Sequence, residues 1–246
     1  MRIVSLAPSA TELLYALGCG DDIVGVTWYC DYPIEAKTKP RVGRWIDIDF
    51  DKVEKLKPDV IFTSTFVQQK VVEECEKRGL HVVHTDPKTL DDVYESIKII
   101  ARAVGRESEG KKIVEDMKKE FSAIRAKAKL PLYVEEWHKP PMASGNWVSE
   151  LIEIAGGMSI LKRGEVSREV SFEEIILFNP RAIVLSWCGF GMTADPNAIK
   201  RRWNLAAPVF VINDSLLNRP GPRLVDGCKK LNAIANLINI VDKNSL

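Results

Sequence analysis

The sequence lacks several patterns that would assign it quickly to a class of protein. It has no G-x-G-x-x-G or G-x-x-x-x-G-K-[ST] motif for nucleotide binding and no G-x-S-x-G motif of a serine hydrolase. No apolar run approaches the roughly 18 residues of a membrane-spanning helix. The formal net charge of +1 gives no electrostatic basis for binding nucleic acid or an anionic membrane. We therefore expect a protein that is not an enzyme.

Metal-binding and disulfide patterns are also missing. The odd number of cysteines and the absence of a C-x-x-C pair argue against a disulfide framework and a zinc ribbon. Of only three histidines, His81 and His84 fall three apart on an expected strand, so they point to opposite faces. We expect no metal site and no intrinsic cofactor.

No secretion signal precedes the first expected strand, because Arg2 leads directly into the apolar run IVSLA. If Met1 is the native start, this predicts a cytoplasmic protein. If an export or anchor segment has been removed, the expected location is outside the cytoplasm and associated with the membrane.

What is present is the composition of a globular protein, with 46% hydrophobic and 28% charged residues. Apolar strand-like runs alternate with segments of helical periodicity, which predicts an α/β fold with parallel sheets. Ser9 and Glu12 form an S-x-x-E capping box that predicts a helix start. Strands are expected over residues 2–7, 22–27, 59–63, 80–84, 132–135 and 208–213. The longer expected helices cover residues 67–78, 88–104, 147–155 and 221–241.

A charged segment near the middle, residues 106–129, has the spacing of a long amphipathic helix. Its apolar residues recur at steps of three and four, at Ile113, Met117, Phe121, Ile124 and Ala128. Such a helix would be roughly 30–35 Å long. It is either a connection between two lobes or an ordinary surface helix.

An internal repeat favours the connection. The pattern F-x-x-[VI]-x-x-[LF]-x-P-x-x-I-x-x-S occurs at Phe50–Ser64 and again 122 positions later, at Phe172–Ser186. Each copy predicts a short helix, a proline stop and a buried strand that ends in serine. We infer two similar lobes on either side of the helix.

Aromatic residues gather where the expected strands end, and ligands of open α/β sheets bind beyond the carboxyl ends of the strands. Each ring alone could simply seal a loop core, but together they predict an apolar surface for a large ligand. These residues are Trp28, Tyr29, Trp45, Phe66, Trp137, Trp147, Trp187 and Phe190.

Polar candidates accompany them. The helix starts at Pro8-Ser9 and Ser144-Gly145 would offer backbone N–H groups. Arg219 or Arg223 would meet an anionic group, or form an ion pair at the surface or between the lobes.

These residues resemble a known family, the substrate-binding proteins of ABC importers whose two lobes are joined by one long helix. The resemblance spans essentially the whole chain and is closest to the cobalamin-binding members. It rests on RIVSLAPSATE at residues 2–12, VGVT at 24–27, CDYP at 30–33 and LKPDVI at 56–61. Further matches are Ser144-Gly145, Gly156-Gly157, Asn179-Pro180 and Pro222-Arg223.

The resemblance implies two Rossmann-like lobes with parallel sheets, at residues 1–105 and 130–246, joined by one long α-helix at residues 106–129. It also implies a ligand cleft between the lobes and docking of one acidic residue per lobe, Asp51 and Glu173, on the permease. Acidic residues at plain helix N-termini would look the same. The implied ligand residues are Pro8, Ser9, Tyr29, Trp45, Phe66, Trp137, Ser144, Trp187 and Arg219.

The implied ligand is a corrinoid. The histidine ligands of zinc and manganese receptors are missing, and the chain offers many aromatic residues but few of the arginines with which ferric siderophore receptors often bind an anionic ligand. A ferric siderophore or haem receptor is the alternative, and a cytosolic two-lobed transferase is the alternative from another class. We expect a monomer whose only other partner is an ABC permease.

Overall fold

The protein is described here by a computed structural model, which describes residues 1–127 and 129–244. The fold is α/β, and the chain divides into two compact units. Unit 1 comprises residues 1–87 and 91–115, and unit 2 comprises residues 88–90 and the chain from Asp116 onward. Each unit contains its own sheet, and the predicted fold class is confirmed.

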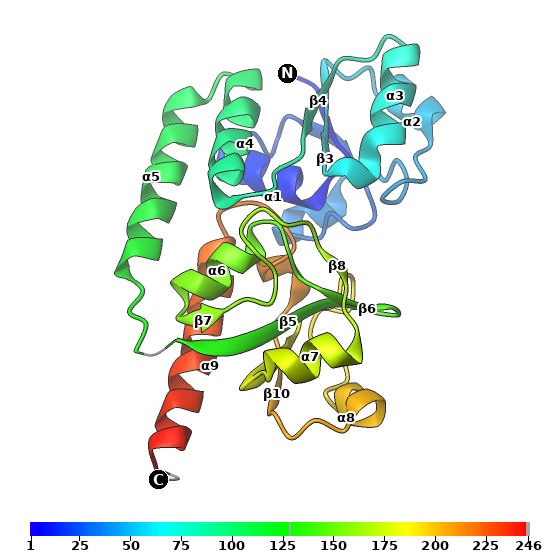
Figure 1. The fold of residues 1–246 in the computed structure, drawn as a ribbon. Helices are drawn as coiled ribbons and strands as arrows, with labels where there is room; N and C mark the ends of the chain where they lie inside the picture. The colour runs from blue at the N-terminus through cyan, green and yellow to red at the C-terminus, as the bar shows by residue number, and fades with distance from the viewer. Residues whose placement is uncertain (128, 245–246) are drawn as a thin grey trace. The chain divides into compact units, whose positions relative to one another are not determined.

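Unit 1 is built on an entirely parallel sheet in the order β2-β1-β3-β4. Its strands are β1 (Ile3–Ser5), β2 (Ile23–Val26), β3 (Val60–Ser64) and β4 (Val82–Thr85). Its helices are α1 (Pro8–Ala16), α2 (Phe50–Lys55), α3 (Gln69–Lys77) and most of α4 (Leu90–Ala103), with 3-10 turns η1 (Ile34–Thr38) and η2 (Phe66–Gln68). Helices α2 and α3 cover one face of the sheet, and α1 and α4 cover the other (Figure 1).

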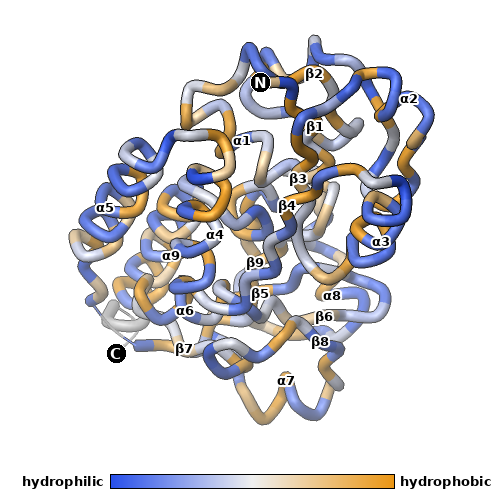
Figure 2. The backbone as a smooth tube through the Cα atoms, turned by 90° about the horizontal axis from the view of Figure 1, so that it is seen from above, coloured by the Kyte–Doolittle hydropathy of each residue, from blue (hydrophilic) through white to orange (hydrophobic). Residues whose placement is uncertain are grey.

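The apolar strands make the core of unit 1, and β1 and β3 appear as hydrophobic segments in Figure 2. Val4, Leu6 and Ile61 are completely buried and pack with Val53 of α2 and Val71 of α3. The alternation of buried side chains therefore attaches these two helices to the sheet.

The start of α1 corrects one prediction. The helix begins at Pro8, so its N-cap is Ala7, which makes no side-chain capping bond. Ser9 lies inside the first turn rather than at the cap. Proline explains the shift, because its fixed φ and missing N–H suit the first helical position.

Unit 2 has a mixed sheet in the order β10-β9-β5-β6-β8, with β7 paired to β5. The strands are β5 (Leu130–His138), β6 (Pro141–Ala143), β7 (Gly157–Met158), β8 (Arg168–Glu169), β9 (Ala182–Leu185) and β10 (Val209–Val211). Strands β10, β9 and β5 are parallel, but β6 runs antiparallel to β5 and β8 antiparallel to β6. The predicted parallel arrangement is present in β10, β9 and β5, whereas β6 and β8 add antiparallel strands that the sequence did not indicate. A tight turn at Lys139-Pro140 folds β6 back onto β5 as a hairpin.

The helices of unit 2 are α6 (Val148–Ile154), α7 (Phe172–Phe178), α8 (Asn197–Trp203) and α9 (Leu224–Asn244), with the 3-10 turn η3 (Asp214–Leu216). Helices α6 and α9 lie on one side of the sheet, and α7 and α8 on the other (Figure 1). The internal repeat corresponds to α2–β3 and α7–β9, so the same order of helix, proline and strand occurs in both units.

Helix α5 spans Glu107–Ala123, so it is shorter than the predicted 106–129. It ends because its last carbonyls find other donors: the Ile124 N–H bonds to Phe121 and the Arg125 guanidinium to Ser122. The chain must then become extended, since Leu130 begins β5. Ile124 follows the helix, and Ala128 lies outside the described residues.

The apolar residues of α5 are used in both units. Near its start, Gly110 has no side chain, which lets α5 lie close to Ala101 of α4 in unit 1. In unit 2, Met117 and Phe121 are buried, and Glu120 pairs with Lys229 of α9 at 2.7 Å. Hydrophilic and hydrophobic stretches alternate along α5 in Figure 2, as expected of an amphipathic helix.

Candidate functional site

Aromatic side chains lie exposed at the carboxyl ends of the strands of unit 1. Trp28 follows β2 with 64% of its surface exposed, and Phe66 follows β3 with 61% exposed. Tyr29 is also exposed. The Arg41 guanidinium lies 5.7 Å from the ring of Trp28 and donates to the carbonyl of Cys30 at 3.0 Å. This edge of the sheet therefore presents large apolar surfaces that the fold leaves uncovered.

The other predicted ligand residues of unit 1 lie deeper. Pro8 and Ser9 are buried in the first turn of α1. Trp45 is half-buried, and its carbonyl accepts a bond from the Gln68 amide at 2.8 Å. The Gln68 amide also donates to Leu6 beyond β1, so it ties the Trp45 loop to the sheet.

The tryptophans of unit 2 divide into exposed and buried rings. Trp137 is 36% exposed, and its indole N–H donates to Lys139. Trp187 and Trp147 are buried, and their indole N–H groups donate to Glu135 at 3.0 Å and to the carbonyl of Leu217 at 2.8 Å. Trp187 stacks on His138 with ring centroids 4.7 Å apart. The buried rings of Trp147 and Trp187 therefore hold the surrounding loops in place, and they do not themselves form part of the exposed surface.

Glu135 is the centre of a buried polar cluster that the sequence did not reveal. Its carboxylate accepts the Tyr133 hydroxyl at 2.8 Å, the Trp187 indole, and the Arg202 guanidinium at 2.6 Å. Burial and the charge of Glu135 raise the pKa of Tyr133. Arg202 comes from α8, which is distant from β5 in the sequence, so no local pattern indicates that Arg202 contacts Glu135.

Glu136 points to the other face of β5. Burial raises the pKa of its carboxyl to about 7, which a hydrogen bond with Ser167 partly opposes. The Ser167 hydroxyl also accepts the Gly145 N–H at 2.9 Å. A side chain on Gly145 would collide with the backbone of residues 165–167, so glycine permits this close approach.

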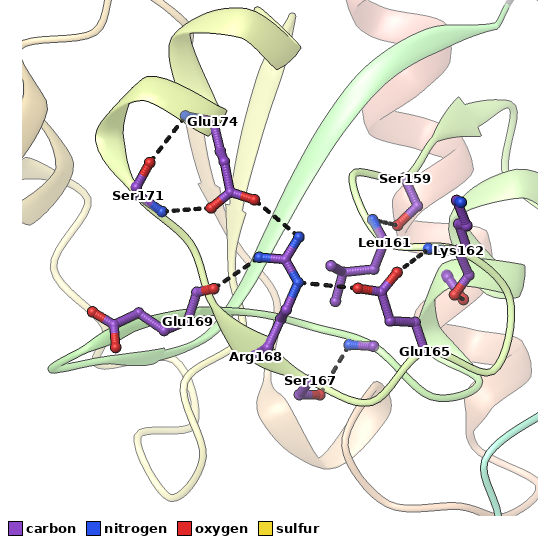
Figure 3. Close-up of polar contacts among 11 residues, drawn as sticks. Ser159, Leu161, Lys162, Glu165, Ser167, Arg168, Glu169, Ser171 and Glu174 are labelled. Carbon is purple, nitrogen blue, oxygen red and sulfur yellow. Dashed lines mark hydrogen bonds and ion pairs between the residues drawn. The ribbon is translucent and has the colours of Figure 1, made fainter.

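The loop that carries Ser167 is fixed by charged side chains. The Arg168 guanidinium bonds to Glu165 at 3.0 Å and to Glu174 at 2.9 Å (Figure 3). These hydrogen bonds raise the pKa of Arg168, with Glu174 the larger cause, and help to lower the pKa of both carboxyls. The network holds Ser167 in place beside Glu136.

Ser144 occupies a different environment from the helix start that was expected. Ser144 is buried after β6, and α6 begins later, after Trp147, so Ser144 does not cap a helix. A tight turn at Asn146 (φ 52°) separates Ser144 from the helix. Arg219 is half-buried and engaged in an interaction of its own.

Asp51 and Glu173 hold equivalent positions in the two copies of the repeat. Each is the second residue of its helix, α2 or α7, and each is exposed. Asp51 lies 3.8 Å from Arg78, and hydrogen bonds at the helix start, with its own backbone and Ser171, lower the pKa of Glu173. Both carboxylates are accessible to a partner.

Other classes of site find no support in the described residues. Within 1–127 and 129–244, no group of three or more His, Cys, Asp and Glu side chains is placed to hold a metal ion. Across the same ranges, no helix combines the length and apolarity needed to cross a bilayer. A surface groove of about 340 Å³ between the end of α5 and α9 contains none of the predicted ligand residues.

The fold is similar to that of periplasmic binding proteins of known structure. The profile described as "Periplasmic binding protein" matches residues 3–214, and the chain belongs to this family.

Individual relatives are similar over nearly the whole chain. The vitamin B12-binding protein of Pectobacterium carotovorum subsp. carotovorum (strain PC1) is 28% identical, over 95% of this chain and 89% of the relative. The periplasmic vitamin B12-binding protein of Vibrio cholerae has a similar fold, with a TM-score of 0.71, 24% identity and coverage of 97% of each chain. The periplasmic heme-binding protein of Roseiflexus sp. RS-1 in apo form gives a TM-score of 0.82 at 20% identity, covering 96% of this chain and 98% of that one.

Proposed function

We propose that the protein is a non-catalytic corrinoid-binding protein and the substrate-binding component of an ABC importer. The observation that carries the proposal is the set of exposed aromatic rings at the strand ends of unit 1, chiefly Trp28 and Phe66. The similarity to vitamin B12-binding proteins over most of the chain supports the choice of ligand. A corrinoid is large and has broad apolar faces, so such rings would bury much of its surface.

The proposed ligand residues have different roles in view of their burial. Tyr29, Phe66 and Trp137 are exposed and would contact the ligand directly, with Trp45 at the edge. Pro8, Ser9, Ser144 and Trp187 are buried and would shape the loops that carry these contacts. Arg219 would orient the ligand beside the end of unit 2.

Titration with cyanocobalamin tests the proposal. We expect binding of one ligand per chain, seen as calorimetric heat and as a change in the visible spectrum of the corrinoid. Trp28→Ala and Phe66→Ala should each weaken binding by roughly tenfold, because each removes a ring worth about 1 kcal/mol or more. Leu177→Ala is the matched control, since Leu177 is 88% exposed on α7, away from the strand ends.

The same titration distinguishes other ligands. Haemin and ferric siderophores serve as competitors. If no cyanocobalamin binds at tens of micromolar while haemin does, the protein is a haem receptor and the corrinoid proposal is wrong.

Delivery to a permease would use Asp51 and Glu173, and the equivalent positions of these exposed acids in the two copies of the repeat support this role. Such delivery requires a location outside the cytoplasmic membrane, as the names of the relatives state for those proteins.

A further inference from the structure

A second polar cluster lies at the end of β5 and β9, on the face of the sheet opposite Glu135. Side chains alternate along a strand, and Trp187 points to Glu135. Glu136, Ser186 and Cys188 therefore point the other way. The Cys188 N–H donates to the Glu136 carbonyl at 3.0 Å. The charge of Glu136 also raises the pKa of the Cys188 thiol, second to burial, so the two side chains are close.

Asn218 completes this cluster from the turn after η3. Its amide N–H groups donate to the Ser186 carbonyl at 2.8 Å and to the Cys188 sulfur at 3.1 Å. Cys188 is exposed as a residue, but its sulfur is turned inward onto this amide. Glu136 and Asn218 are half-buried, so all three residues remain partly accessible from the carboxyl end of the sheet.

The cluster is uncharged below about pH 7, and Glu136 ionises as the pH rises through that value. Burial raises the pKa of Glu136 to about 7 and that of Cys188 to about 12, and Asn218 does not titrate. Asp214 also acts on Cys188, and its two oxygens accept the N–H groups of Gly189 and Gly191 at 2.9 and 2.8 Å. The cluster therefore offers neutral donors and acceptors from a site where a charge is unfavourable.

Some of the hydrogen-bonding atoms of this cluster have no partner among the described residues. Asn218 Oδ1 is buried and has no partner in the described part of the chain. The same holds for the hydroxyls of Ser186 and Ser144 beneath it. Buried polar atoms are rarely left unpaired, so these atoms indicate a polar group that binds from outside.

We propose that Glu136, Cys188 and Asn218 form a neutral subsite that binds a carboxamide group of the ligand and disfavours a carboxylate. A neutral carboxyl can donate and accept at once, which is the complement of a primary amide. A carboxylate would bring a negative charge to desolvated acceptors. Corrinoids carry amides around the ring and haem carries propionates, so this subsite would select between them. The inference rests on the proposed function.

The test compares cyanocobalamin, its monocarboxylate derivatives and haemin as ligands of the wild-type protein, Glu136→Gln and the control Glu169→Gln. Glu169 is exposed on neighbouring β8. With the wild type, affinity for cyanocobalamin should fall about tenfold from pH 6 to pH 8 as Glu136 ionises. Glu136→Gln should remove this dependence, since its amide cannot ionise, and Glu169→Gln should retain it. At least one monocarboxylate should bind more weakly than cyanocobalamin, and haemin should bind weakly.

Modification of Cys188 gives a second readout. Methyl methanethiosulfonate should react faster with Cys188 in Glu136→Gln, because loss of the carboxylate lowers the thiol pKa, and bound cyanocobalamin should protect the thiol. The inference is overturned if cyanocobalamin binds but Glu136→Gln keeps the wild-type pH dependence, or if the ligand leaves the Cys188 rate unchanged. Failure of every corrinoid to bind overturns the proposed function as well, so the two failures are distinguishable.

Discussion

Glu135 is completely enclosed, and three donors depend on its carboxylate. Glu135→Ala would leave the Arg202 guanidinium without its anion and the Trp187 indole without its acceptor. Removing one partner of a buried ion pair typically costs about 3–5 kcal/mol. We expect a loss of this size in the free energy of unfolding, measured by urea denaturation followed by far-UV circular dichroism.

Two further variants separate charge from hydrogen bonding in that cluster. Glu135→Gln keeps one of the two acceptor oxygens, which serve the Tyr133 hydroxyl and the Trp187 indole separately, and should cost less than Glu135→Ala. Glu169→Ala, at an exposed position, should stay within about 0.5 kcal/mol of the wild type. Equal stability of Glu135→Ala and Glu169→Ala would contradict the role of the buried pair.

At the scale of elements, α7 begins with a complete capping box. The Ser171 hydroxyl accepts the Glu174 N–H at 3.2 Å, and the Glu174 carboxylate accepts the Ser171 N–H at 2.9 Å (Figure 3). Ser171→Ala should lower the free energy of unfolding by about 1 kcal/mol, and Ser171→Asp should restore most of it, because aspartate is also a good N-cap.

The contribution of Glu174 to the stability of this cap should depend on pH in a defined direction. The pKa of Glu174 is lowered, chiefly by the Ser171 N–H and then by Arg168. Its contribution is therefore present above the ordinary glutamate pKa and is lost as the pH falls through the lowered value. The stability difference between wild type and Glu174→Gln should therefore shrink in acid, whereas Ser171→Ala keeps the N–H that Glu174 binds and should retain the wild-type pH dependence. A difference that grows there would show that Glu174 is not part of the cap.

The elements that the sequence predicted well are those with strong local signals. The repeated helix–proline–strand unit and the buried strands β1, β3 and β9 follow from apolar runs and proline stops. The β6–β8 pairing could not be predicted, because the strands are two or three residues long and are separated in the chain by α6 and β7. The segment after α5 is held by Asn232 of α9, whose amide donates to the Arg125 carbonyl, and no local pattern indicates this contact.

The candidate site was predicted unevenly for the same reason. Aromatic residues after strands could be found from their positions alone. Glu136, Cys188 and Asn218 come from three separate segments, and their meeting depends on the register of β5 against β9. Burial of Trp147 and Trp187 could not be predicted either, since each indole is held by a distant acceptor.

At the scale of the whole molecule, Asp51 and Glu173 are predicted to be needed for transport but not for ligand binding. Asp51→Lys and Glu173→Lys should leave the affinity for cyanocobalamin within about twofold, because both residues lie at exposed helix starts. Uptake by vesicles that hold the cognate importer should fall by about tenfold or more, since each change replaces an attraction to a partner cation with repulsion. Glu115→Lys, exposed on α5, is the control. Normal uptake by both lysine variants would exclude this docking mode.

The division of tryptophans into exposed and buried rings also has an optical consequence. Trp28 emits from water, while Trp147 and Trp187 emit from the protein interior. Light emitted at longer wavelengths should therefore report mainly on Trp28 at the strand ends of unit 1, with a smaller part from Trp137, and light at shorter wavelengths should report the integrity of unit 2. A coloured ligand bound beside Trp28 would absorb that emission before the fold itself changed, so the chain carries separate intrinsic fluorescent reporters of occupancy and of folding.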